Sequence, residues 1–302
     1  MKRMKLDNYN LTASIHTVDI RSKNMPSIPQ NINLKVLKSS YLQKSQQWSI
    51  RINPNKLEGD IFCCSEFYAT MHKLTGQLQL PDYIYYRTDI RLDSYEDDFK
   101  AYYKLNQLLI SLFSLLFHDT NGQAISHLLA GSKEFTDIST KNQYWEVKYY
   151  NKKFQTNDDD PAKARLEFRS LKSTNRSGYT PHEIKMKWFE KLDQLPKLYD
   201  DLQKLCNKML FNAYQAYCNY NSKYQKKGDY ATGFLSNYSN GMTIFTRNQL
   251  REFLQLCGLS EKTASNRTES IIERVYIEFF SRADLERYIT KIKFAMDDYF
   301  DC

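Results

Sequence analysis

Residues 86–93 read YRTDIRLD, and this alternation of charged and apolar side chains decides the fold class. Two later segments repeat the pattern: residues 144–152 (YWEVKYYNK) and residues 164–172 (ARLEFRSLK). Side chains on a β-strand point to opposite faces with a period of two, so each segment gathers its charges on one face and its apolar residues on the other. The pattern predicts half-buried strands with one face on a core and one polar face.

The predicted polar face collects side chains that suit phosphodiester chemistry. Its members are Arg87, Asp89, Arg91 and Asp93 from the first segment, Glu146, Lys148, Tyr150 and Lys152 from the second, and Arg165, Glu167 and Arg169 from the third. Asp89, Asp93 and Glu167 would give oxygen ligands to Mg²⁺ or Mn²⁺, which would act as a Lewis acid on a phosphate. A solvated sheet face with cross-strand salt bridges would show the same alternation, so both interpretations stay open.

The surrounding segments predict an α+β fold. Short strands and turns precede residue 93, a long apolar helix covers residues 97–117, and strands follow again. This order is typical of an antiparallel sheet with helices on one face, and we expect the 97–117 helix to pack on the apolar face. Beyond Thr180 the apolar spacing becomes helical. We therefore expect a nuclease domain at 1–180 and a helical DNA-recognition domain at 181–302.

The composition bears on partners and location. The chain has 43 Lys and Arg against 35 Asp and Glu, a formal net charge of +8, which favours an anionic partner without identifying it. The apolar stretch at residues 105–117 is shorter than the roughly 20 residues that span a bilayer. No apolar secretory segment follows the charged start. We expect a cytoplasmic protein with no membrane partner.

Residues 246–274 predict a second DNA-binding element. Thr246 and Ser260 can each cap a helix, and Gly258 suits the left-handed end of the first helix. The spacing resembles a helix-turn-helix, whose second helix inserts into the major groove. The residues that this helix would present to DNA are Lys262, Ser265, Asn266 and Arg267. An ordinary antiparallel helix pair would produce the same sequence, so this alternative also stays open.

The order of the motifs resembles that of known replication initiators. The string KYYNKKFQ followed by ARLEFRSLK is similar to a signature of initiators from Gram-positive rolling-circle plasmids. RTDIRLD resembles a strand of those initiators and of the gene II-type initiators of filamentous phages. INPNKL, at residues 52–57, resembles a turn of the phage proteins. The resemblance covers roughly residues 49–172.

The resemblance implies a DNA nicking-closing endonuclease that starts rolling-circle replication of a plasmid. Carried over position by position, it assigns the nucleophile to Tyr150, metal or acid-base roles to Asp89 and Glu167, and phosphate contacts to Lys152 and Arg165. Lys148 and Arg169 would add DNA contacts on the same face. Many rolling-circle nucleases hold their metal with a His-hydrophobic-His pair, which this chain lacks, so the metal ligands stay open.

Two other tyrosines compete with Tyr150 for the role of nucleophile. Tyr149 is its neighbour, and Tyr179 follows the third segment. The strand-face count favours Tyr150 over Tyr149, because Tyr150 shares its face with the charged residues.

The reaction implied by the resemblance leaves a 5′-phosphotyrosyl protein and a free 3′-OH that primes a polymerase. The expected partners are double-stranded origin DNA and single-stranded DNA. The family alone implies a host helicase and a host polymerase as further partners. A homodimer is one assembly that we expect. A relaxase of a mobilisable or conjugative element would use the same chemistry. A non-catalytic DNA-binding regulator is the alternative from a different functional class.

Overall fold

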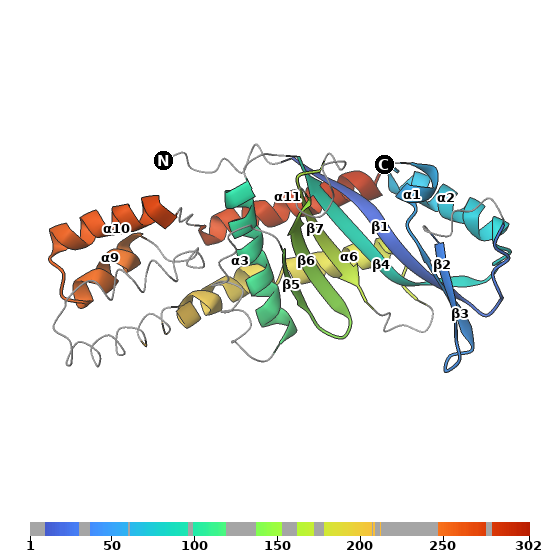
Figure 1. Ribbon diagram of the computed structural model, residues 1–302, viewed down its shortest axis with the longest axis horizontal. Helices are drawn as coiled ribbons and strands as arrows, with labels where there is room; N and C mark the ends of the chain where they lie inside the picture. Colours follow the sequence, from blue (N-terminus) through green and yellow to red (C-terminus); the bar gives the residue numbers. More distant parts are fainter. Residues whose placement is uncertain are drawn as a thin grey trace. The chain divides into compact units, whose positions relative to one another are not determined.

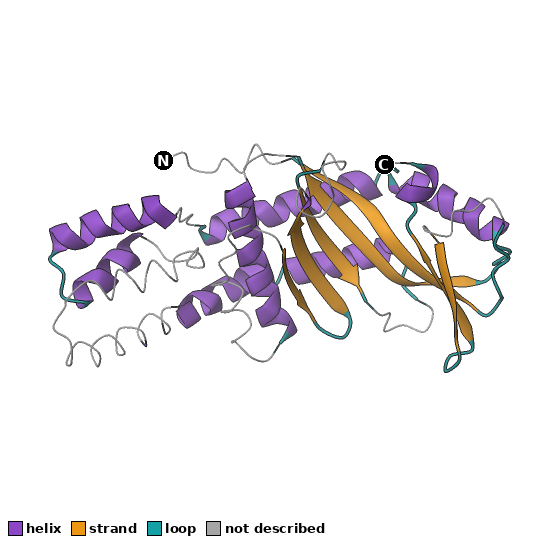
Figure 2. Ribbon diagram, viewed as in Figure 1, coloured by secondary structure: helices purple, strands orange, loops and turns teal. Residues whose placement is uncertain are grey.

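The computed structural model describes residues 10–29, 37–59, 61–95, 99–118, 137–152, 162–171, 178–206, 208, 212, 247–275 and 280–302. Within these residues the fold is α+β, with a seven-stranded sheet and surrounding helices (Figure 2), which confirms the predicted fold class. Among the helices of this described part, none is long and apolar enough to cross a membrane.

The chain divides into two compact units, each assembled from separated segments. The first, which we call the sheet unit, consists of Lys5–Asp97, Lys141–Asp193 and Tyr288–Cys302. The second consists of Met1–Met4, Asp98–Thr140 and Gln194–Arg287. This division does not coincide with the expected boundary at residue 180, because the helix that begins there belongs to the sheet unit.

Seven strands form the sheet in the order β2-β3-β1-β4-β7-β6-β5 (Figure 1). Their bounds are β1 Leu11–Ser22, β2 Leu37–Leu42, β3 Gln47–Ile52, β4 Tyr83–Ser94, β5 Asp137–Lys141, β6 Trp145–Asn151 and β7 Ala164–Ser170. The neighbours from β2 through to β6 pair antiparallel. The three segments that alternate charge with apolar residues therefore lie side by side, as β4, β7 and β6.

The strand register confirms the predicted polar face. Residues directly opposite each other in a ladder share a face. Glu167 on β7 lies opposite both Arg91 on β4 and Lys148 on β6. Arg165 likewise lies between Asp93 and Tyr150. The charged residues of all three strands thus form one continuous surface.

The apolar face of the sheet packs on α6, Pro181–Leu192. Thr180 caps this helix in a capping box with Glu183, and the ring of Trp188 lies 5.0 Å between centroids from Phe168 on β7. Trp188 is fully buried. Figure 1 shows α6 and α11 (Arg282–Phe300) behind the strands.

Two further helices border the sheet unit's N-terminal half. They are α1, Asn55–Glu58, which follows the turn after β3, and α2, Cys64–Gln77, whose Phe67 ring lies 6.3 Å from that of Tyr85 on β4. The helix expected to cover the apolar face forms as α3, Phe99–Phe117, but it belongs to the second unit. Within the sheet unit α6 takes that place, because Ile184, Trp188 and Leu192 give it a buried stripe.

The second unit contains the helix pair that the sequence predicts. It consists of α9, Arg247–Leu256, and α10, Glu261–Val275. Gly258 ends the first helix with a φ of +88°, and the Ser260 hydroxyl accepts a hydrogen bond from the Thr263 amide at 3.4 Å, as expected of these two residues. Thr246, the expected cap of α9, lies outside the described residues. The helical segment expected beyond Thr180 is seen as α6 and a further helix over residues 195–206, beyond which most residues up to 246 are not described.

Candidate active site

The polar face brings Tyr150, Glu167 and Arg165 together within the sheet unit. Tyr150 and Arg165 lie opposite each other on β6 and β7, and Glu167 is two residues further along β7. The Tyr150 hydroxyl donates a hydrogen bond to Oε1 of Glu167 at 2.5 Å. His16 on β1 completes the group, since its Nδ1 lies 3.8 Å from the same oxygen. We call these four residues the Tyr150 cluster.

Burial controls the protonation of the Tyr150 cluster. Tyr150, Arg165 and Glu167 are each no more than 5% exposed. Burial, assisted by the charge of Glu167, raises the pKa of Tyr150, so the phenol keeps its proton at neutral pH. Burial alone would also raise the pKa of Glu167, but the charge of Arg169 and the hydrogen bond from Tyr150 hold it below its ordinary value. Tyr150 therefore faces an ionised carboxylate, the arrangement of a hydroxyl nucleophile and its base.

His16 is a member of the cluster that sequence reasoning missed. It sits at an irregularity of β1, where Ile15 pairs with Ile90 and Thr17 pairs with Asp89, leaving His16 without an opposite residue. Such a bulge re-aims a side chain, here toward Glu167. Burial lowers the pKa of His16 to about 4, although Glu167 acts to raise it. The imidazole is therefore neutral near pH 7.

Arginines hold the carboxylates of the polar face in two-point ion pairs. Arg165 donates from Nε and Nη2 to both oxygens of Asp93 at 2.5 and 2.8 Å. Arg87 binds both oxygens of Asp89 in the same way, at 2.8 and 2.5 Å. Glu167 accepts from Nε of Arg169 at 2.7 Å. Charge-assisted pairs of this geometry are stronger than neutral hydrogen bonds and fix the side chains in place.

The same ion pairs bear on the expected metal site. Asp89, Asp93 and Glu167 each engage at least one oxygen with an arginine. Across the part of the chain that the structure describes, no three His, Cys, Asp or Glu side chains group closely enough to hold a metal ion. The three carboxylates therefore do not fit a preformed Mg²⁺ or Mn²⁺ site in this arrangement, and the divalent metal stays a prediction from the sequence.

The remaining predicted residues of the polar face surround Tyr150. The Lys148 and Lys152 ammonium groups lie 5.1 and 6.0 Å from the centroid of its ring. Tyr149 points to the opposite face, where it lies opposite Leu166. Tyr179 lies under Lys187, whose ammonium is 4.6 Å from its ring centroid. The structure thus gathers Lys148, Lys152 and Tyr150, and leaves Tyr149 outside the group.

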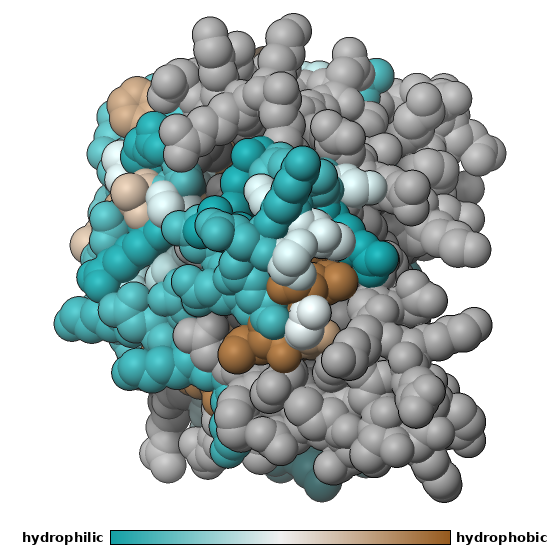
Figure 3. All heavy atoms as spheres, turned by 90° about the vertical axis from the view of Figure 1, so that its left-hand side faces the viewer, coloured by the Kyte–Doolittle hydropathy of each residue, from teal (hydrophilic) through white to brown (hydrophobic). Residues whose placement is uncertain are grey.

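The predicted DNA-contacting residues of α10 lie toward its outer side. Lys262 and Asn266 are exposed, whereas Ser265 and Arg267 are partly buried. Ala264 and Thr268 are the buried positions of this helix among those described. Figure 3 shows that the described surface on this side of the molecule is mostly hydrophilic, with a hydrophobic patch within it. A role of these four side chains in DNA binding stays a prediction.

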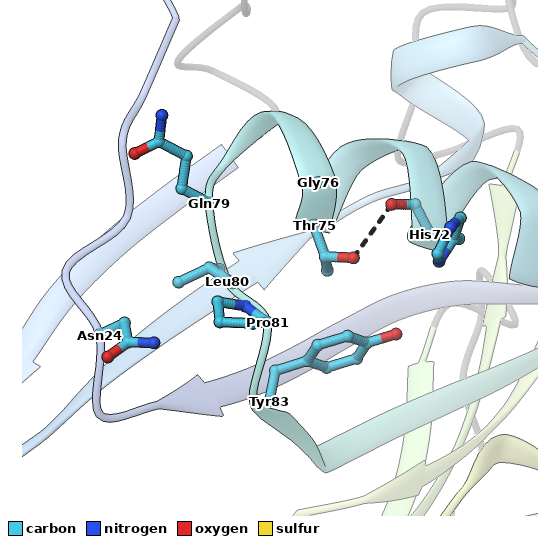
Figure 4. A pocket seen from close by; sticks show the side chains of 8 residues that line it. All are labelled: Asn24, His72, Thr75, Gly76, Gln79, Leu80, Pro81 and Tyr83. Carbon is cyan, nitrogen blue, oxygen red and sulfur yellow. Dashed lines mark hydrogen bonds between the residues drawn. The ribbon is translucent and has the colours of Figure 1, made fainter.

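A separate pocket lies at the C-terminal end of α2, with a volume of about 550 Å³ (Figure 4). Its lining residues are Asn24, His72, Thr75, Gly76, Gln79, Leu80, Pro81 and Tyr83. Tyr83 pairs with Ser22, which shares the apolar side of β1 with Ile20. The pocket therefore opens on the other side of the sheet from Tyr150, and none of its described lining residues is a carboxylate.

Comparison with known proteins gives one weak similarity. No protein-family model and no curated protein matches the chain. A solved structure of a rolling circle replication initiator protein from Geobacillus stearothermophilus aligns with 13% identity and a TM-score of 0.26, over 54% of this chain and 76% of that chain. A TM-score this low does not establish a common fold.

Proposed function

We propose that this chain is a DNA nicking-closing endonuclease that initiates rolling-circle replication of a plasmid, with Tyr150 as its nucleophile. One observation carries the proposal: a buried tyrosine donates its hydroxyl hydrogen to a buried, ionised carboxylate on a face that is rich in arginine and lysine. The motif resemblance supports the same assignment, because its tyrosine, glutamate and arginine are the residues that converge here.

In the proposed reaction the Tyr150 oxygen attacks a phosphorus atom of one DNA strand. A new bond forms between phosphorus and the phenol oxygen, and the bond from phosphorus to the 3′-oxygen breaks. The phenol proton passes to Glu167 Oε1, and the departing 3′-oxygen takes up a proton to become a 3′-OH. The 5′-phosphate stays on the tyrosine, so the bond energy is conserved and no nucleotide cofactor is consumed.

The cations of the polar face would stabilise the charge that gathers on the phosphate oxygens. Arg165 lies opposite Tyr150 in the ladder, and Lys148 and Lys152 flank its ring. Preorganised positive groups in a buried site stabilise such a transition state more than they would in water. Without them a phenol whose pKa is raised by burial would be a poor nucleophile.

Nicking of supercoiled plasmid DNA that carries the gene's own upstream region tests the proposal. Tyr150→Phe should keep DNA binding but lose both the nicked product and the covalent protein–DNA adduct, because only the nucleophilic oxygen is removed. Tyr149→Phe is the matched control, since its ring lies on the opposite face, and it should nick normally. An adduct that survives in Tyr150→Phe rules out this nucleophile, and Tyr179→Phe would be tested next.

A relaxase for a mobilisable or conjugative element would give the same products in this assay. Replication of a plasmid carrying the gene in a host without conjugation genes would favour the initiator. A non-catalytic regulator would bind the upstream region without cutting it.

A further inference from the structure

The polar face continues beyond the Tyr150 cluster onto the outer strands of the sheet. On β1, Asp19 pairs with Arg51 of β3, and Arg51 pairs in turn with Lys38 of β2. Arg21 shares this face with Asp19, because the two are two positions apart in a regular stretch of the β1–β3 ladder. The guanidinium carbon of Arg21 lies 3.1 Å from the centroid of the Tyr86 ring on β4. We call Arg21, Lys38, Arg51 and Tyr86 the outer basic patch.

The cations of the outer basic patch differ in their ion pairing. Arg51 and Arg87 on this part of the face each bind an aspartate through two hydrogen bonds. Arg21 and Lys38 form no ion pair with any residue in the described part of the chain. Both are therefore free to meet a negative charge from outside.

Positive side chains outnumber carboxylates over the whole polar face. Its cations are Arg21, Lys38, Arg51, Arg87, Arg91, Lys148, Lys152, Arg165 and Arg169, and its anions are Asp19, Asp89, Asp93, Glu146 and Glu167. Nine cations face five carboxylates, so the surface as a whole favours an anion.

The surroundings of Arg21 suit binding of an external anion better than an ion pair within the fold. When the flat face of a guanidinium lies over an aromatic ring, its N–H groups point outward in the guanidinium plane. They can then still donate hydrogen bonds to a ligand. The Nε of Arg21 is buried and has no hydrogen-bond partner among the described residues. A buried donor without an acceptor is unfavourable, and an incoming phosphate oxygen would satisfy it.

We propose that the outer basic patch binds the phosphate backbone of single-stranded DNA on its way to Tyr150. Glu167 lies opposite Arg91, and Tyr86 is five residues before Arg91 on β4, so Tyr86 and Glu167 are roughly 17 Å apart at about 3.3 Å per residue and 4.8 Å per strand. An extended strand of a few nucleotides spans that distance. A single DNA strand fits this role better than a duplex, because Tyr150, Arg165 and Glu167 are each no more than 5% exposed and a wide duplex could not reach them.

Binding of a fluorescein-labelled dT15 oligonucleotide to the full chain tests the inference, which rests on the proposed function. Fluorescence anisotropy would be recorded from 50 to 300 mM NaCl for the parent, Arg21→Gln, Lys38→Ala and the control Lys56→Ala. Lys56 is an exposed cation on α1, outside the patch. Each lost phosphate contact lowers the logarithmic salt slope by about 0.7, which corresponds to about fivefold weaker binding at 0.1 M salt. We expect this loss for Arg21→Gln and Lys38→Ala and no change for Lys56→Ala.

Several outcomes would overturn the inference. The first is that Arg21→Gln and Lys38→Ala bind dT15 with the same affinity and salt slope as Lys56→Ala. The second is that the parent chain does not bind dT15. Lys38 lies on an edge strand with its side chain exposed, so Lys38→Ala still tests the inference if Arg21→Gln folds poorly. The nicking assay of Tyr150→Phe is a separate test. Nicking by this variant would contradict Tyr150 as the nucleophile, but it would not change the binding result for the outer basic patch.

Discussion

Removing Asp93 should destabilise the protein far more than removing Asp19, although both aspartates hold an arginine in the same two-point geometry. Arg165 donates to Asp93 at 2.5 and 2.8 Å, and Arg51 donates to Asp19 at 2.7 and 2.9 Å. The difference lies in the arginine that would be left behind. The side chain of Arg165 is 3% exposed, whereas that of Arg51 is 54% exposed.

The expected magnitudes follow from this difference in exposure. Asp93→Ala leaves a buried guanidinium without its main counter-charge, which costs about 3–5 kcal/mol of unfolding free energy. Asp19→Ala leaves an arginine that water can solvate, and exposed pairs contribute about 0.2–1 kcal/mol. The two substitutions remove the same atoms, so lost methylene packing cannot explain a gap between them.

Urea unfolding followed by circular dichroism would measure both changes against the parent chain. The Asp93→Ala midpoint should fall by several times the shift of Asp19→Ala. Equal, small shifts would mean that water reaches Arg165 and that the polar face is a solvated surface. That result would also weaken the proposal that Tyr150 reacts in a site from which water is excluded.

Three other predictions concern recognition, metal and pH. Replacing Asn266 and Arg267 by Ala should weaken binding to the origin duplex by about 1–3 kcal/mol for each base contact and leave a scrambled duplex nearly unchanged, as measured by competition titration at fixed salt. Glu167→Gln should strongly slow nicking whatever divalent ion is added, because it removes the group that accepts the Tyr150 proton, whereas full-rate nicking by the parent chain in excess chelator would contradict the expected metal. Burial acts to raise the pKa of Asp284, but hydrogen bonds at the N-cap of α11 hold it below its ordinary value. Its stabilisation is therefore present above about pH 4 and decreases as the pH falls further, so Asp284→Ala should cost about 1 kcal/mol at pH 7 and less at pH 3, measured by urea unfolding at both pH values.

The polar face was predictable because its signal is local. A period of two puts Asp89 and Asp93 on the same side of one strand whatever lies beside it. The same rule separates Tyr150 from Tyr149 without any knowledge of the fold. Pairing three such strands in one sheet then follows from the need to bury three apolar faces together.

The helix that covers the sheet was not predictable in the same way. A helical apolar stripe shows that a helix has a buried side, but not which surface that side meets. Residues 97–117 and α6 both carry such a stripe. Trp188 of α6 is the residue that contacts β7, and its partner Phe168 is 20 positions earlier in the sequence.

His16 illustrates a second limit of the sequence. Its segment, LTASIHTVDI, contains one histidine in a strand, with no second histidine to suggest a site. Its place beside Glu167 depends on β1 lying next to β4, which is a long-range pairing, and on an irregularity that local alternation does not reveal. His16 could have been identified from the sequence only if the pairing of β1 with β4 had been predicted first.

The arginine pairs of the polar face set the conditions under which it can accept DNA. Without DNA, Arg165 and Arg169 are bound to Asp93 and Glu167. A phosphate that approaches Tyr150 competes with these carboxylates for the same donors, so its binding free energy is the difference between two charge-assisted pairs rather than the full strength of one. Among the described residues, Arg21 has no carboxylate partner to give up. A strand that first engages Arg21 therefore gains affinity without breaking an ion pair, and it can bring the next phosphates to Arg165 at high local concentration.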